Sequence, residues 1–268
     1  MHTAIPPDVL GCLVAGFEKG GTTLVKDLVR RAGRLRGSFE GGLLLADSPA
    51  EGVPEPYGSL LVKAWGLPEG FLDEYRTCRT FEEGYRLLRD RSDVITEKHR
   101  PLIDKTPRYM MHLEAVLRRA PTTPVVVVIR EPALVVRSWL GLGQPRGEAV
   151  EAVRNSATGL AAVARSRTGI DRVYTVHLDD LMISPQATLD AMSAWLGFVP
   201  RPHDPSMLVG TRNADGVHTG IDPERNDSSR VFTAEQRGEI EAALADAGPE
   251  VAWVRGLTTG PLAEASIP

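Results

Sequence analysis

A lysine and two threonines lie within a short glycine-rich stretch near the start of the chain, in a setting suited to anion binding. The stretch, residues 16–23, reads GFEKGGTT and includes Lys19, Thr22 and Thr23. The apolar residues 13–15 predict the end of a buried strand, and the pattern from residue 22 onward predicts a helix. Glycines let the backbone approach a ligand, while consecutive N–H groups and the helix dipole favour negative charge. We therefore predict a P-loop-like phosphate-binding loop.

The spacing of the glycines is that of a Walker A loop, but the residues after them differ. Four residues separate Gly16 from Gly21, as in that loop. The Walker A loop continues with Lys-Ser/Thr, whereas this chain has Thr22 and Thr23 and carries its lysine three places earlier, at Lys19. Two hydroxyl groups are thus left to bind a phosphate, with the lysine beside it. The structural alternative is an ordinary strand–glycine–helix connection, and the lysine and threonines favour anion binding over it.

A second candidate anion site follows the strongest strand pattern of the chain. Residues 124–129, PVVVVI, predict a central parallel strand that is covered on both faces. Arg130 comes next, at the carboxyl end where α/β sheets bind ligands, and Ser138 lies eight residues further, about two helical turns on. A guanidinium and a hydroxyl together can grip a phosphate. The alternative is that Arg130 pairs with a carboxylate and Ser138 is incidental.

Both stretches resemble sulfotransferases that use 3′-phosphoadenosine 5′-phosphosulfate (PAPS). In that family a Lys or Arg precedes Ser-Gly-Thr-Thr in the loop that binds the 5′-phosphosulfate. The matching residues here are Lys19, Gly20, Gly21, Thr22 and Thr23, with Gly20 in place of the serine. The resemblance implies that the Gly20 backbone N–H keeps its contact although the side-chain hydroxyl is missing.

The resemblance extends to the second site and to the end of the chain. In the family, an apolar strand is followed by an Arg, then by Asp, Asn or Glu with Pro, and by a Ser eight residues after the Arg. This segment binds the 3′-phosphate, and Arg130 and Ser138 match its Arg and Ser. Residues 225–232, RNDSSRVF, resemble its closing loop, so Ser229 and Arg230 are expected to add 3′-phosphate contacts, or else to be solvated loop residues. Leu178 stands where the family has a tyrosine, so no adenine contact is predicted there.

The resemblance also implies how the residues share the transfer chemistry. Sulfuryl transfer needs in-line positioning and charge stabilisation, and Lys19 is expected to stabilise the leaving phosphate. Glu40 lies 21 residues after Lys19, close to where sulfotransferases acting on sugars and protein tyrosines carry a catalytic glutamate, so it is the expected base. Asp47 is the fallback, and a surface role for Glu40 is the alternative. Lys105, in Asp-Lys-Thr-Pro, is expected to face the sulfuryl group.

The remaining pattern predicts an α/β fold, three-layer α/β/α with a central parallel sheet. Further strands are expected near residues 35–45, 102–103 and 173–176. Helices are expected within 59–92, broken at 66–68, and at 107–119, 148–167, 185–196 and 233–247. We expect one domain over residues 1–268, in which residues 200–230 form a loop or lid and residues 257–268 a loose tail.

Composition narrows the class of protein. The chain has 268 residues, of which 42% are hydrophobic and 25% charged, and a net charge of −4, which argues against nucleic-acid or membrane-surface binding. Two cysteines cannot form a disulfide framework, and we expect a cytoplasmic protein without a signal peptide or membrane span. The six histidines show no metal-ligand spacing, so no metal is expected. Arginine greatly outnumbers lysine, which is typical of a GC-rich bacterial genome.

These features together predict a bacterial, PAPS-dependent sulfotransferase of the EC 2.8.2 type. It would move a sulfuryl group to an acceptor hydroxyl without a metal and release 3′,5′-bisphosphoadenosine. The acceptor is expected to be a small molecule or glycan, and sugar, phenol, lipid and peptide hydroxyls all remain open. Two alternatives are a P-loop kinase acting on a small molecule and a non-catalytic nucleotide-binding module. Nothing in the sequence predicts the oligomeric state.

Overall fold

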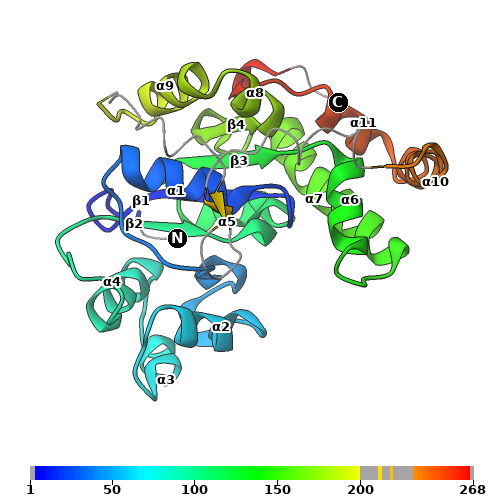
Figure 1. Cartoon of the computed structure of the whole chain (residues 1–268). Helices are drawn as coiled ribbons and strands as arrows, with labels where there is room; N and C mark the ends of the chain where they lie inside the picture. Colours follow the sequence, from blue (N-terminus) through cyan, green and yellow to red (C-terminus); the bar gives the residue numbers. More distant parts are fainter. Residues whose placement is uncertain (1–3, 200–210, 213–217, 220–231, 266–268) are drawn as a thin grey trace.

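The protein is built on a five-stranded sheet with helices on both faces (Figure 1). The structure is a computed structural model that describes residues 4–199, 211–212, 218–219 and 232–265. The strand order is β2-β1-β3-β4-β7. Four strands are parallel: β1 (Leu10–Gly16), β2 (Leu102–Lys105), β3 (Val125–Ile129) and β4 (Val173–His177). The fifth, β7 (Gly260–Pro261), is antiparallel at one edge.

Alternating side chains of the central strands enter two separate apolar cores, which is why the sheet is covered on both faces. Leu13 and Ala15 of β1 belong to one core, and Cys12 and Val14 to the other. All five residues of β3 are fully buried. The predicted three-layer α/β/α fold is therefore confirmed, with an antiparallel edge strand added to the expected parallel sheet.

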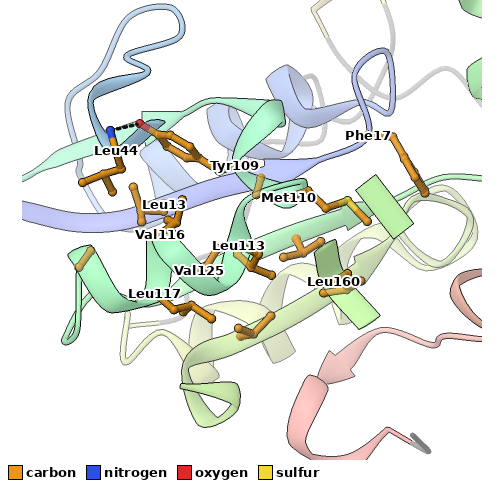
Figure 2. Packing of buried hydrophobic residues seen from close by; sticks show 14 of the residues in the cluster. Leu13, Phe17, Leu44, Tyr109, Met110, Leu113, Val116, Leu117, Val125 and Leu160 are labelled. Carbon is orange, nitrogen blue, oxygen red and sulfur yellow. Dashed lines mark hydrogen bonds between the residues drawn. The ribbon is translucent and has the colours of Figure 1, made fainter. Parts of the chain in front are cut away.

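Three helices share the smaller core: α1 (Thr22–Ala32), α8 (Leu178–Ile183) and α9 (Pro185–Trp195). The larger core, part of which is drawn in Figure 2, receives the other helices that the structure describes. They are α2 (Tyr57–Ala64), α3 (Phe71–Arg76), α4 (Phe81–Arg91), α5 (Leu113–Arg119), α6 (Pro132–Leu140), α7 (Arg146–Ser166), α10 (Ala234–Ala245) and α11 (Pro249–Arg255). Among the helices within these described ranges, none is both long and apolar enough to cross a membrane.

The strand order creates a switch point between β1 and β3. The chain leaves β1 through α1 and returns at β2, on one side of β1, whereas β3 lies on the other side. Gly16, the last residue of β1, is in register with Val128 near the end of β3. Chain segments that leave two such strands diverge and open a crevice at their carboxyl ends, where ligands of α/β proteins bind. The fold thus places the residues after β1 and after β3 beside each other.

Three segments differ from the sequence-based expectation. Residues 35–45 form no strand: Arg36 makes a single bridge to Leu102, and the apolar run becomes a 3₁₀ turn, η1 (Leu43–Leu45), after Gly42 adopts a φ of 68°. The helix expected over residues 107–119 is split into a 3₁₀ turn, η3 (Pro107–Met110), and α5. The turn comes first because Tyr109 is fully buried and its hydroxyl bonds to Asp104 instead of facing solvent.

The end of the chain is the third difference. Residues 257–265 were expected to belong to a loose tail, yet β7 pairs with β4, and a further 3₁₀ turn, η8 (Leu262–Glu264), buries Leu262 completely. Most of the expected loop over residues 200–230 lies outside the described residues. The part that is described consists of two short strands, β5 (Thr211–Arg212) and β6 (His218–Thr219), which pair with each other.

Candidate active site

The glycine-rich loop after β1 turns sharply into α1. The Lys19 backbone takes a φ of 65°, in the left-handed region that few residues other than glycine adopt, and Gly21 takes a φ of 90°. Helix α1 begins at Thr22 without a side-chain cap. Its first N–H groups have no partner within the helix, and they carry the positive end of the helix dipole. The loop and the helix start together form a cradle for an anion.

Gly20 differs in one respect from the expectation. Its N–H donates to the Phe17 carbonyl at 2.9 Å, so this amide is already used within the loop. A Cβ at position 20 would lie 2.7 Å from the same carbonyl oxygen. The serine of the resembled family would therefore not fit unless the loop moved. The first amides of α1 and the hydroxyls of Thr22 and Thr23 lie next to this turn and can donate to a phosphate.

Arg130 joins the two predicted anion sites. It follows β3 directly, and its Nη1 donates to the Lys19 carbonyl at 2.8 Å and to Ser138 Oγ at 3.3 Å. Ser138 lies on α6 and donates in turn to the Leu134 carbonyl at 2.9 Å. The structure thus brings the glycine-rich loop, Arg130 and Ser138 to one place, at the switch point of the sheet.

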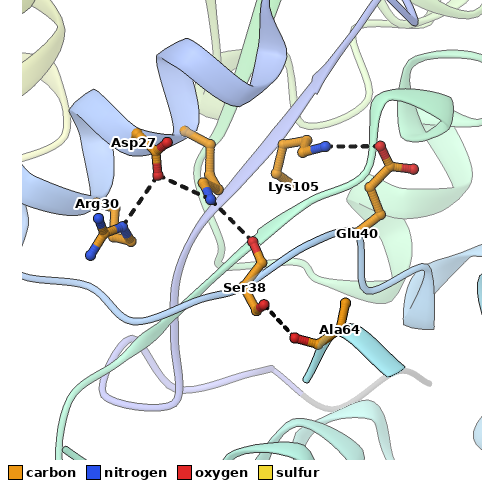
Figure 3. A network of polar contacts seen from close by, with 7 residues as sticks. Asp27, Arg30, Ser38, Glu40, Ala64 and Lys105 are labelled. Atoms are coloured by element: carbon orange, nitrogen blue, oxygen red, sulfur yellow. Dashed lines mark hydrogen bonds and ion pairs between the residues drawn. The ribbon is translucent and has the colours of Figure 1, made fainter. Parts of the chain in front are cut away.

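Glu40 and Lys105 form an ion pair (Figure 3), and Lys105 belongs to β2, which lies on the opposite side of β1 from β3. Lys105 Nζ donates to Glu40 Oε1 at 2.8 Å, and the side chains are 2% and 17% exposed. Lys105 is the last residue of β2, so the site spans the carboxyl ends of three neighbouring strands: Lys105 at the end of β2, Lys19 after β1 and Arg130 after β3. The ring of Phe39 lies 4.6 Å from Lys105 Nζ and is itself 42% exposed. A carboxylate, two lysines and an accessible aromatic ring thus gather beside the anion cradle.

Three more residues belong to this region and were missed by the sequence analysis: Glu18, Tyr57 and Arg108. Burial and the Glu40 carboxylate raise the pKa of Glu18, while Arg108, Lys19 and a hydrogen bond with Tyr57 oppose the rise. Burial, followed by the charges of Glu18 and Glu40, raises the pKa of Tyr57 as well. For Glu18 the sequence did carry a signal, namely an acidic side chain within a predicted phosphate-binding loop. Such a carboxylate must turn away from the phosphate and toward other partners. Tyr57 and Arg108 come from distant segments and carry no local signal.

Other predicted residues stand elsewhere. Asp47, the fallback base, is exposed and pairs with Arg119 of α5, which also donates to the Leu44 carbonyl. Leu178 packs over Gly21, at the place where the resembled family has a tyrosine. Ser229 and Arg230 lie outside the described residues. Within residues 4–199 and 232–265, no group of three or more His, Cys, Asp or Glu side chains has an arrangement that could hold a metal ion.

The comparisons with known proteins agree with the fold. Residues 12–199 match the model of the sulfotransferase family, and the chain therefore belongs to that family. Nodulation protein NoeE of Sinorhizobium fredii (strain NBRC 101917 / NGR234) is 25% identical over 227 residues, which cover 75% of this chain and 53% of NoeE. The chain thus spans about half the length of this curated relative.

Two solved structures share the fold. The sulfotransferase domain from the Synechococcus PCC 7002 olefin synthase has a TM-score of 0.62 at 20% identity, covering 87% of this chain and 94% of that domain. The sulfotransferase domain from the curacin biosynthetic pathway has a TM-score of 0.61 at 18% identity, covering 91% and 99%. Both therefore match over nearly their full length.

Proposed function

We propose that this protein transfers a sulfuryl group from PAPS to an acceptor hydroxyl and releases 3′,5′-bisphosphoadenosine. The observation that carries the proposal is the contact of Arg130 with both the Lys19 carbonyl and Ser138. A bisphosphorylated nucleotide needs two anion sites a short distance apart, and this contact supports the proposal because it connects the two predicted sites. Membership of the sulfotransferase family supports the same reading.

Each residue has a distinct part in this proposal. The first amides of α1, Thr22 and Thr23 hold the 5′-phosphate, and Arg130 and Ser138 hold the 3′-phosphate. The donor supplies an activated sulfuryl group, and the bond that breaks joins its sulfur to the 5′-phosphate oxygen. Lys19 stabilises the charge that this oxygen gains, because a preorganised cation beside a leaving group lowers the barrier.

On the acceptor side, Glu40 takes the proton of the attacking hydroxyl while the new sulfur–oxygen bond forms. Lys105 holds Glu40 and faces the sulfuryl oxygens. Ser229 and Arg230 are proposed to add contacts to the 3′-phosphate. We take the reaction to need no metal, since Arg130 follows β3 where a Walker-type enzyme carries a magnesium-binding acid. We assign the enzyme to a bacterial cytoplasm, in agreement with two free cysteines.

A ligand-binding experiment tests the proposal. We expect 3′,5′-bisphosphoadenosine to raise the melting temperature of the protein, because a ligand that binds only the native state stabilises it, and ATP with magnesium to have a smaller effect. Titration calorimetry should show that Arg130→Ala weakens bisphosphoadenosine about 10- to 100-fold, the equivalent of one or two charged hydrogen bonds. Arg154→Ala is the control, since Arg154 is exposed and pairs at the surface with Glu151.

The alternatives give different results in the same assay. A small-molecule kinase would respond more strongly to ATP with magnesium than to bisphosphoadenosine. A non-catalytic module would bind bisphosphoadenosine but transfer nothing from PAPS to a panel of sugar, phenol, lipid and peptide acceptors. Unchanged bisphosphoadenosine affinity in Arg130→Ala would remove the proposed 3′-phosphate site.

A further inference from the structure

Asp104, which the proposed mechanism does not use, is a fully buried carboxylate at the end of β2. It accepts four hydrogen bonds. The hydroxyls of Tyr85 and Tyr109 donate to Oδ2 at 2.7 Å each, and Thr106 Oγ1 donates to Oδ1 at 3.0 Å. The fourth donor is the backbone N–H of Gly41, at 3.1 Å from Oδ1. Burying a charge is costly unless its lone pairs are satisfied, and this one is surrounded by donors.

The donors around Asp104 also bind the loop that carries Glu40. The Gly42 N–H donates to Thr106 Oγ1 at 3.0 Å, and the Leu44 N–H donates to the Tyr109 hydroxyl at 3.2 Å. With the bond from Gly41, three amides between residues 41 and 44 therefore end on Asp104 or on its partners. This segment forms no strand, so these side-chain acceptors take the place of sheet hydrogen bonds.

The geometry allows little freedom at this point. A Cβ on Gly41 would lie 2.7 Å from Asp104 Oδ2, so the loop backbone rests directly on the carboxylate. Glu40 precedes Gly41, and its partner Lys105 follows Asp104, so both members of the ion pair are covalent neighbours of this contact. Burial raises the pKa of the Asp104 carboxyl, and the hydrogen bonds from Tyr109 and Tyr85 oppose the rise.

We propose that Asp104 is a positioning residue, whose carboxylate fixes the turn at Gly41 and thereby holds Glu40 against Lys105. This inference rests on the proposed function, in which Glu40 is the base. Asp104 would not touch the substrate. Its loss would act through Glu40, since displacement of a catalytic group by about 1 Å can lower the rate by about 100-fold.

The test compares two buried tyrosines that differ in their partner. Tyr85→Phe removes one donor to Asp104, whereas Tyr75→Phe removes a hydroxyl that donates to the Leu43 carbonyl at 3.3 Å and leaves Asp104 fully bonded. We expect Tyr85→Phe to lower kcat about 10-fold or more, and Tyr75→Phe to leave it unchanged. The affinity for bisphosphoadenosine should stay at the wild-type value in both. Glu40→Gln removes the proposed base itself, so its loss of kcat is the upper limit for any loss that mispositioning of Glu40 can cause.

A second variant does not depend on the loss of a hydroxyl. Gly41→Ala keeps every side-chain donor of Asp104 but forces the loop away from it, so kcat should fall at unchanged bisphosphoadenosine affinity. Amide hydrogen exchange over residues 38–44 should be faster in Tyr85→Phe than in Tyr75→Phe. The proposal is overturned if Tyr85→Phe and Gly41→Ala both keep the wild-type kcat, or if Tyr75→Phe loses as much as Tyr85→Phe.

Failure of the proposed function would look different. In that case the wild-type protein transfers nothing from PAPS to any acceptor, and kinetics decide nothing about Asp104. Hydrogen exchange then decides: equal protection of residues 38–44 in Tyr85→Phe and Tyr75→Phe overturns the positioning role, and a selective loss of protection in Tyr85→Phe supports it.

Discussion

Single side chains decide what charge the site can accept. Lys105 ends β2 and Lys19 follows the neighbouring β1, while the charges of Glu40, Arg108 and Lys19 all act on Glu18. In the proposed function, Lys19 neutralises charge on the leaving phosphate and Lys105 faces the sulfuryl oxygens. The proposed base, Glu40, lies against Lys105, so the acceptor hydroxyl would approach the sulfuryl group on the Glu40 side.

Lys19 is expected to contribute mainly to the chemical step. Lys19→Ala should lower kcat about 100- to 1,000-fold, the usual result of removing one group that stabilises charge only in the transition state. Steady-state kinetics with PAPS should show a smaller change in KM. Lys63→Ala, at an exposed lysine of α2, is the matched control and should behave as wild type. A variant that loses only donor affinity, with kcat intact, would contradict the role in leaving-group stabilisation.

Glu18 makes stability depend on pH. Burial and the nearby Glu40 raise its folded-state pKa above the ordinary value of 4.5, so the native state binds the proton more tightly than the unfolded state. Wild-type protein should therefore lose stability as the pH rises from about 4.5 through the raised pKa. Glu18→Gln lacks this loss and should be the more stable protein near neutral pH.

Urea unfolding of both proteins over a series of pH values measures this effect. The difference in unfolding free energy between Glu18→Gln and wild type should grow with rising pH and then level off above the folded-state pKa. Glu69→Gln, at an exposed glutamate, should show no such trend. A difference that stays constant across the series, or one that grows as the pH falls, would contradict the assigned direction of the shift.

At the scale of elements, the sequence predicted those features that depend on residues close together in the chain. The valine run of β3 has to be buried on both faces, so the strand and the position of Arg130 at its carboxyl end followed from the sequence. The turn after β1 followed in the same way from its glycines. Thr80 and Thr233 cap α4 and α10 by equally local contacts, each accepting a bond from the amide three residues later. These features depend on neighbours within one or two turns.

Long-range pairings were not predictable from the same signals. The apolar residues 43–45 have the composition of a strand, but the glycines before them and the acceptors around Asp104 turn the segment into η1. Glu40 was placed near the site only by its distance from Lys19 in a resembled family. Its partner Lys105 lies 65 positions away, and no periodicity encodes that contact. Tyr57 and Arg108 escaped prediction for the same reason.

At the scale of the whole molecule, the end of the chain closes the sheet. Gly260–Pro261 pairs with β4, Thr175 Oγ1 donates to the Thr258 and Gly260 carbonyls, and Leu262 lies fully within the larger core. This segment lies beyond residues 12–199, the part matched by the family model. If residues 4–265 unfold as one domain, a defect in the tail must weaken the entire structure.

Leu262→Ala tests that coupling. Removing a fully buried leucine side chain should lower the free energy of unfolding by about 2–5 kcal/mol, because apolar burial is lost and a cavity remains. Leu142→Ala is the matched control: Leu142 is 58% exposed, and its loss should cost no more than about 0.5 kcal/mol. Urea unfolding should be followed by two probes, tryptophan fluorescence and far-ultraviolet circular dichroism, whose transitions should coincide in both variants. An unfolding free energy for Leu262→Ala equal to that of Leu142→Ala would mean that the tail is not part of the cooperative unit. A Leu262→Ala transition that separates into two steps would instead assign the tail and the carboxyl end of the sheet to different units, against the single domain that the chain was expected to form.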